Sequence, residues 1–424
     1  MPGIMAGKCP AAASVRKPVQ TGTRLLIAYI AFVSLGLPDA VIGIAWPSVR
    51  ETFGLGQAAL GYYFLAVGAG VFTSGIISGR LVQWLGLGPL LIASTLLASC
   101  ALFGIALSPV WPVAVLAALV LGLGSGAIDA GVNGFAAANF SPRQVNWLHA
   151  CYSTGAATGP LVMTAVLTGG KPWTSGYFTI AVTLLGMAVL FTATRGMWRS
   201  TPVLSRAAEP AAAPTAKLPL AFETVGPWEA FRHPLVPVQM VIFFAYTGLE
   251  VTLGQWAYTV NTEGRGVAEA TAGLWTTGYW AAILAGRLTL GAIVERVGPD
   301  RLVRWATVGA VAGSGLFALG GPGAGAVGLV IAGFWLAPIF PTLISRTAGR
   351  LPPGVAAHAV GFKISAAMVG VAVVPLVAGV AAETFGLEAV GFVAAATAAS
   401  LLAGHEALLR MSSSEHSRNA TPLA

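Results

Sequence analysis

The chain has 424 residues and is strongly apolar: apolar residues make up 56% of it, and Asp, Glu, Lys and Arg together only 9%. A soluble protein carries about 25% charged residues, so this composition excludes a soluble enzyme, a nucleic-acid-binding protein and a disordered chain. The mean hydropathy of +0.79 indicates a polytopic membrane protein instead. We attribute the net charge of +8 to the membrane surface and not to a DNA-binding face.

Twelve stretches are long and apolar enough to cross a bilayer, because a spanning helix needs about 20 predominantly apolar residues. They lie near residues 25–49, 58–78, 89–108, 111–138, 146–168, 175–197, 236–260, 271–294, 302–320, 324–345, 357–382 and 388–409. We therefore predict an all-α integral membrane protein with twelve transmembrane helices. Pro38 and Asp39 interrupt the first apolar run, which argues against a cleavable signal peptide.

The distribution of Lys and Arg predicts the orientation of these helices. With the N-terminus inside, eighteen Lys and Arg residues fall on inside segments, and three fall outside, namely Arg50, Lys171 and Arg265. Both tails, 1–24 and 410–424, are therefore expected to be cytoplasmic. The expected location is a plasma membrane of the bacterial inner-membrane type, with membrane lipid around a monomer.

One inside segment, 198–235, is much longer than the others and divides the helices into two sets of six, at 25–197 and 236–409. Its Ala- and Pro-rich part, 201–219, is typical of a flexible linker. Residues 227–233 are expected to form a short interfacial helix.

The two sets of six helices also repeat each other. A shift of 212 residues places Gly79 on Gly291 and Gly86 on Gly298. Such a repeat predicts two related six-helix bundles around a central cavity, an architecture common among secondary transporters.

The loop after the second span reads Gly-Arg-Leu-Val-Gln-Trp-Leu-Gly-Leu-Gly over residues 79–88. It resembles the loop motif Gly-x-Leu-Ala-Asp-Arg-x-Gly-x-Lys of the major facilitator superfamily, although Gln83 and Trp84 replace charged members. The equivalent loop of the second half keeps an acid and an Arg. Inner gating is therefore expected to depend on charges of this half: Arg287, Glu295 and Arg296. The alternative is that these residues are ordinary loop anchors.

Six further stretches carry a more specific resemblance: 36–39, 124–133, 146–149, 155–160, 248–256 and 338–342. They are similar to the fucose-permease-like group of sugar–proton symporters. The resemblance implies the twelve-helix major facilitator fold and proton-coupled transport of a sugar. The chain departs from the group by having Asp129 in place of a Glu, and Pro38 and Tyr152 where the permease has Asn.

Three carboxylates, those of Asp39, Asp129 and Glu250, fall in the middle third of their spans. An ionisable group at this depth costs a few kcal/mol, and burial makes proton exchange near neutral pH possible. The resemblance implies that the acids of the first and fourth helices carry protonation, so we expect Asp39 and Asp129 to couple protons to transport. An alternative for Asp39 is that its side chain satisfies backbone groups freed by Pro38.

The remaining polar and aromatic candidates are expected to bind the solute. Glu250 would accept hydrogen bonds from hydroxyl groups, and nearby Gly248 and Gly254 could let its helix unwind beside a ligand. Aromatic rings would stack on the flat faces of a sugar. The expected binding residues are Glu250, Asn133, Gln255, Trp256, Trp46, Tyr152, His149 and Lys363.

For two of these candidates a role other than direct solute binding is also considered. His149, near the inner end of its span, could be an interfacial histidine. Lys363 could reach the inner surface with its long side chain, or it could face the cavity and pair with an acid or an anionic solute.

We therefore predict a carrier, and not an enzyme, that moves a small polar solute, a sugar or polyol, with protons. No metal and no cofactor is expected, and sodium stays open as the coupling ion. A drug–proton antiporter is one alternative: Gly155, Gly159 and Pro160 match its fifth-helix signature, but Asn146, Met163 and Thr164 replace its other three glycines. A carrier for an anionic solute such as a sugar acid is another.

Overall fold

The computed structural model describes residues 18–198 and 225–420, and this part of the chain contains helices and no strand. Eleven of its helices are long and apolar enough to cross a membrane. The remaining predicted span is α6 (Pro142–Thr168), a helix of 27 residues whose polar side chains lower its hydropathy. All twelve predicted spans therefore lie in helices, and the predicted all-α fold is confirmed.

The first half of the molecule contains six spans. Its helices are α1 (Pro18–Asp39), α2 (Val41–Phe53), α3 (Ala59–Leu85), α4 (Leu87–Ala106), α5 (Trp111–Asn139), α6 and α7 (Trp173–Thr194), followed by the short 3-10 turn η1 (Arg195–Trp198). The first span consists of α1 and α2, which are interrupted at Ala40. This break follows Pro38, whose ring disturbs the regular helical hydrogen bonds. Asp39 therefore lies at the last position of α1.

The second half repeats this arrangement. Its helices are α8 (Pro227–Arg232), α9 (Leu235–Thr259), the π-helical turn η2 (Val260–Gly264), α10 (Glu269–Val297), α11 (Pro299–Leu319), α12 (Pro322–Leu336), α13 (Ile339–Ser345), α14 (Thr347–Arg350), α15 (Pro353–Phe385) and α16 (Ala389–Ala420). The short helix predicted over 227–233 is observed as α8. The linker predicted over 201–219 lies outside the described residues.

The sequence repeat is visible in how equivalent helices end. Gly86 ends α3 with φ +80° and Gly298 ends α10 with φ +91°, a region that only glycine enters readily. Each glycine donates its backbone N–H to the carbonyl four residues earlier, on Val82 and Val294. These pairs are related by the same 212-residue shift, so the two halves build this turn in the same way.

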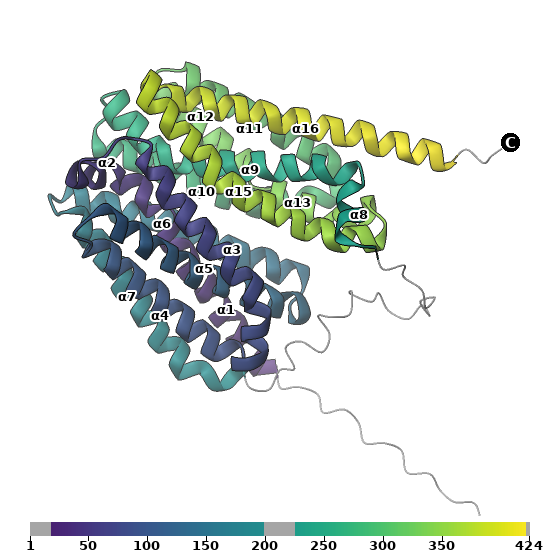
Figure 1. Ribbon diagram of the computed structural model, residues 1–424, viewed down its shortest axis with the longest axis horizontal. Coiled ribbons are helices and arrows are strands. Elements are labelled where there is room, and N and C mark those ends of the chain that lie inside the picture. The colour runs from purple at the N-terminus through teal and green to yellow at the C-terminus, as the bar shows by residue number, and fades with distance from the viewer. Residues whose placement is uncertain (1–17, 199–224, 421–424) are drawn as a thin grey trace, which may run out of the picture.

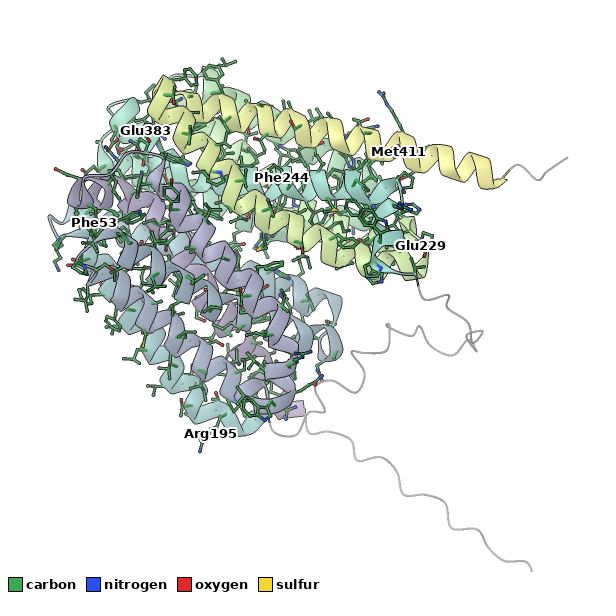
Figure 2. All side chains as sticks on the ribbon, viewed as in Figure 1. Phe53, Arg195, Glu229, Phe244, Glu383 and Met411 are labelled. Atoms are coloured by element: carbon green, nitrogen blue, oxygen red, sulfur yellow. The ribbon has the colours of Figure 1, made fainter. Side chains whose placement is uncertain are left out.

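The two halves meet at one end of the molecule and separate at the other (Figure 1). We call the end of α2 and the start of α3 the distal end, and the opposite end, where α7 ends and α9 begins, the linker end. At the distal side a Cβ on Gly43 would lie 2.6 Å from the carbonyl oxygen of Gln255, so α2 and α9 are in backbone contact. At the linker end Arg195 and Glu229 lie far apart (Figure 2). The molecule is thus closed at its distal end.

Helix α9 is continuous from Leu235 to Thr259, so the expected unwinding beside Glu250 does not occur. The two glycines that suggested it serve close packing instead. A Cβ on Gly248 would meet the side chain of Val374, and one on Gly254 would meet Trp280. Small residues of this kind allow neighbouring helices to approach within a membrane.

Candidate functional site

Two carboxylates of the first half each accept one hydrogen bond from a neutral side chain. Tyr152 of α6 donates its hydroxyl to Asp39 Oδ2 at 2.6 Å. Asn133 donates its amide to Asp129 Oδ1 at 2.9 Å, one helical turn away on α5. In the described part of the chain, neither carboxylate lies within 4 Å of a Lys or Arg nitrogen.

These two carboxylates are also partly exposed. The Asp39 side chain bonds to a tyrosine and not to the backbone near Pro38. Its own carbonyl oxygen accepts a hydrogen bond of 2.7 Å from Gln255 Nε2 of the second half. The helix break therefore presents the Asp39 carboxylate to the interior without using it to cap the backbone.

The carboxylate of the second half, Glu250, has different surroundings. Its Oε2 accepts the hydroxyl of Tyr246, one turn earlier on α9. Its Oε1 lies 3.8 Å from Arg287 Nη2, and the two side chains are each 12% exposed. Tyr279 of α10 donates to the Glu250 carbonyl oxygen at 2.8 Å. This acid therefore has a cation beside it, unlike the two acids of the first half.

Arg287 joins the two halves. From α10 its Nη1 donates to Ser153 Oγ at 2.6 Å and to the His149 carbonyl oxygen at 3.1 Å, both on α6. Its guanidinium also lies over the ring of Tyr152, 5.7 Å from the centroid. Contacts between polar side chains thus run from Asp39 through Tyr152 and Arg287 to Glu250, and Asp129 and Asn133 form a second pair in the first half. We call these six residues the central cluster: Asp39, Asp129, Asn133, Tyr152, Glu250 and Arg287.

The two tryptophans expected to stack on a sugar are placed elsewhere. Trp46 and Trp256 are both fully buried. Trp46 donates to Gln57 Oε1 at 2.9 Å and packs beside Trp111, and Trp256 donates to the Pro375 carbonyl oxygen at 3.2 Å. Their faces are covered by neighbouring helices at the closed distal side, so stacking on a solute is not available to them in this structure.

Lys363 takes neither of its expected positions. It is fully buried inside the second half, where its Nζ donates to Thr347 Oγ1 and lies 3.2 Å from Gln239 Oε1. The ammonium also sits 4.9 Å from the ring centroid of Phe243. Oxygen atoms of α9 and α14 satisfy this cation, which explains why it neither extends to the surface nor pairs with an acid.

His149 contributes its backbone to the central cluster and not its ring. The imidazole packs edge-on against Phe32, with centroids 5.5 Å apart. Gln255 uses its amide group on Asp39, as described above, while its Oε1 is buried without a hydrogen-bond partner. The chain thus brings together six of the thirteen predicted site residues in one cluster, and Gln255 and His149 border it.

Comparison with known proteins identifies the family. The model of the Major Facilitator Superfamily matches residues 28–362 of the chain. This chain belongs to the Major Facilitator Superfamily. Together with its structural neighbours, this membership makes it a membrane transporter of a small molecule and not an enzyme.

Two proteins similar to this facilitator are known from sequence. "Bypass of stop codon protein 6" of Saccharomyces cerevisiae is 23% identical over 86% of this chain and 78% of its own length. "Uncharacterized transporter y4wD" of Sinorhizobium fredii is 29% identical over 72% of this chain and 77% of its own.

Solved structures share the fold at low identity. The nucleoside transporter NupG gives a TM-score of 0.68 at 17% identity, covering 92% of this chain and 98% of NupG. A variant of the E. coli fucose:proton symporter FucP gives 0.62 at 15% identity, covering 92% and 99%. A bacterial homologue of the lysosomal transporter Spinster gives 0.68 at 11% identity, covering 96% and 100%.

The linker end of this facilitator carries a charge cluster that the loop motif did not reveal. The predicted gating residues Glu295 and Arg296 are exposed, and neither forms an ion pair with another described residue. Asp300, at the start of α11, instead pairs with Arg346 at 3.2 Å and with Arg350. The sequence did contain a signal for this charge cluster, because Asp300 lies in the first turn of a helix directly after Gly298 and Pro299.

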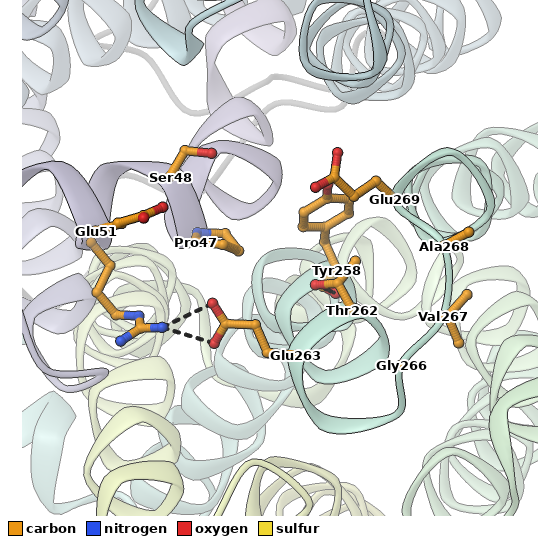
Figure 3. Close-up of a pocket in the computed structure, with 11 residues that line it drawn as sticks. Pro47, Ser48, Glu51, Tyr258, Thr262, Glu263, Gly266, Val267, Ala268 and Glu269 are labelled. Carbon is orange, nitrogen blue, oxygen red and sulfur yellow. Dashed lines mark hydrogen bonds and ion pairs between the residues drawn. The ribbon is translucent and has the colours of Figure 1, made fainter. Parts of the chain in front are cut away.

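The distal end of this facilitator is held by polar contacts between the halves. Arg50 of α2 pairs with Glu263 at 2.9 Å, and Gln57 donates to the same carboxylate at 3.0 Å. Glu383 of α15 accepts the Ala58 backbone N–H at 3.0 Å. Figure 3 shows Glu51, Glu263 and Glu269 around a cavity of about 530 Å³ beside this contact. Among the described residues, no group of His, Cys, Asp and Glu side chains is arranged to hold a metal ion.

Proposed function

We propose that this transporter imports a small polar solute, a sugar or a related polyol, together with protons. The observation that carries the proposal is the pair of partly exposed carboxylates, Asp39 and Asp129, each with one neutral hydrogen-bond partner. A carboxylate inside a membrane protein with no cation beside it can become neutral by binding a proton.

The solute would bind next to these acids, between the halves. Tyr152 and Asn133 already donate to the acids, and Glu250 has spare acceptor positions beyond its bond to Tyr246. Hydroxyl groups of a sugar can both donate and accept hydrogen bonds, so they fit such a mixed set. Two proteins with the same fold are a fucose:proton symporter and a nucleoside transporter, and a polar solute for this chain is consistent with them.

The orientation follows from the charge distribution. If the Lys- and Arg-rich linker end lies in the cytoplasm, the closed distal end faces the outside of the plasma membrane. The structure then corresponds to an inward-facing state of a monomer. Transport would require the Arg50–Glu263 contact to open while the linker end closes, which is alternating access around the central cluster.

Reconstituted transport tests this proposal. Purified protein in proteoliposomes would be given radiolabelled sugars and polyols under an inward proton gradient, an inward sodium gradient, or neither. We expect accumulation of at least one solute only with the proton gradient. Accumulation driven by sodium alone, or proton-driven extrusion of hydrophobic drugs without sugar uptake, would contradict it.

A further inference from the structure

We propose that the transported solute carries a carboxylate group, and that Arg287 binds this group in a cavity between α6, α10 and α13. This inference rests on the proposed function, since it names the class of polar solute that enters the same site. A sugar acid or another polyhydroxy acid is the chemistry that fits.

The cavity has a volume of about 150 Å³ and lies on the linker side of the central cluster. Arg287 supplies the only charge among its described lining residues. Neutral polar groups surround it, namely Asn146 of α6 and Thr342 and Ser345 of α13. Asn146 also lies against Gly291 of α10, so the cavity is bounded by both halves. A ligand here would contact one cation and several hydrogen-bonding side chains.

The guanidinium of Arg287 donates from Nη1 to Ser153 and to the His149 carbonyl oxygen. Its Nη2 lies 3.8 Å from Glu250 Oε1, beyond hydrogen-bond distance, and its Nε forms no hydrogen bond with any described residue. The hydroxyl of Tyr246 lies near the same guanidinium, so a ligand would bind beside it. The Nε and Nη2 groups of arginine point in parallel and match the two oxygens of a carboxylate.

Two other arginines of this chain form bidentate ion pairs with a carboxylate. Arg265 donates from Nε and Nη2 to both oxygens of Glu388, at 2.8 and 2.6 Å. Arg304 does the same with Glu406, at 2.5 and 2.6 Å. Against these, the single 3.8 Å approach of Glu250 neutralises Arg287 without occupying its edge. Glu250 is held back by its bond to Tyr246 and so leaves room for a second carboxylate.

A carboxylate fits better than a phosphate. Glu250 already balances the charge of Arg287, and the carboxylates of Asp39, Asp129 and Glu250 would repel a dianion more strongly than a monoanion. If both aspartates carry protons when the solute enters, the loaded cluster holds only the charges of Glu250, Arg287 and the solute. Transport of one such anion with two protons would move one positive charge inward.

The test compares acids with neutral molecules of the same carbon skeleton. Binding of D-gluconate and D-glucitol, and of D-galactonate and galactitol, would be measured on the purified full-length transporter by calorimetry at one pH, with glucose 6-phosphate as the phosphate probe. We expect at least one acid to bind ten times or more as tightly as its polyol. Equal binding of acid and polyol, or tight binding of the phosphate ester alone, would overturn the inference while leaving proton-coupled polyol import intact.

Paired substitutions assign the preference to Arg287. Arg287→Gln combined with Glu250→Gln keeps the net charge of the cluster, and we expect it to remove the preference for the acid. Arg287→Lys keeps the charge but loses the planar edge, so the preference for the acid should fall several-fold. This single substitution disturbs packing less than the double one does. The matched control, Arg265→Gln with Glu388→Gln, removes an ion pair outside the cluster and should change nothing. Retention of the full preference by both Arg287 variants would overturn the inference.

If no sugar-derived probe binds and a hydrophobic amine binds instead, the proposed function itself is wrong. That result differs from failure of the carboxylate assignment, in which polyols still bind.

Discussion

The two halves of this transporter place acids at the same central cluster but give them different neighbours. The carboxylates of Asp39 and Asp129 in the first half accept hydrogen bonds from Tyr152 and Asn133, whereas the carboxylate of Glu250 in the second half faces Arg287. A carboxylate inside a membrane protein binds a proton more readily when no cation lies beside it. Under the proposed function the two halves would therefore divide the work, with protons carried by the first half and the charge of the solute bound by the second.

The largest expected effect comes from removing the acids of the first half. Asp39→Asn and Asp129→Asn should each abolish accumulation driven by a pH gradient, because an amide cannot carry a proton. Solute counterflow, which needs no net proton movement, should survive in at least one variant. Full accumulation in both variants would show that neither acid is needed for proton coupling, and the proposed difference between the two halves would be refuted.

Glu250→Gln should change affinity and leave proton coupling in place. A neutral polyol would lose an acceptor for its hydroxyl groups, which costs about 1–3 kcal/mol or roughly tenfold in affinity. A sugar acid would bind more tightly, because Glu250 no longer competes for Arg287. Binding measured across pH distinguishes this from coupling: a changed pH profile with unchanged affinity would move Glu250 into the proton-carrying group.

Tyr152→Phe tests whether the hydrogen bond from Tyr152 to Asp39 contributes to proton coupling in the first half. It removes the one hydrogen bond that the Asp39 carboxylate accepts from a described residue while keeping the ring beneath Arg287. We expect driven accumulation to fall several-fold and solute affinity to change less than twofold. Tyr62→Phe, the same change at an exposed position of α3, is the control. A large loss of affinity with normal accumulation would assign Tyr152 to the solute.

Glu263→Gln tests the distal contact between the halves. An exposed ion pair contributes about 0.2–1 kcal/mol, so the balance between distal-open and distal-closed states should shift by about two- to fivefold. Labelling of a cysteine at Ser48, which lines the cavity beside this contact, would report the opening in a variant without the native cysteines. Glu388→Gln removes an ion pair within the second half and should leave labelling unchanged, and an equal effect of both substitutions would refute the gating role.

Lys363→Met should have the smallest effect on transport. The ammonium is buried among oxygens of the second half, away from the central cluster. Replacing it leaves Gln239 and Thr347 without their partner, so we expect a lower melting temperature. The affinity for both neutral and acidic solutes should stay the same, and a selective loss of acid binding would show that Lys363 reaches the solute.

Much of the fold could be predicted from the sequence, because span length and charge distribution are local properties. The twelve spans, the helix at α8 and the repeated turns at Gly86 and Gly298 are found where the sequence placed them. The break in α1 follows from Pro38. The length of α16 could not be foreseen, since its last turns are polar and continue beyond the apolar run.

The candidate site could be predicted only in part. The intramembrane acids were recognisable because each is costly at that depth. Which cation or helix faces them depends on packing between segments more than one hundred residues apart. For this reason the sequence did not show that Trp46, Trp256 and Lys363 are buried away from the central cluster. Arg287 was predicted to be a gating residue. Because an unpaired cation inside the membrane is costly, its position in a span also indicated that an acid lies nearby.

Proton movement measured together with solute movement tests the central claim most directly. Proteoliposomes in a lightly buffered medium would be given the solute, and the external pH recorded. We predict that the medium becomes alkaline with the unmodified protein and with Glu250→Gln, and that it stays unchanged with Asp39→Asn combined with Asp129→Asn. Solute-dependent alkalinisation that persists in the double variant would contradict the account.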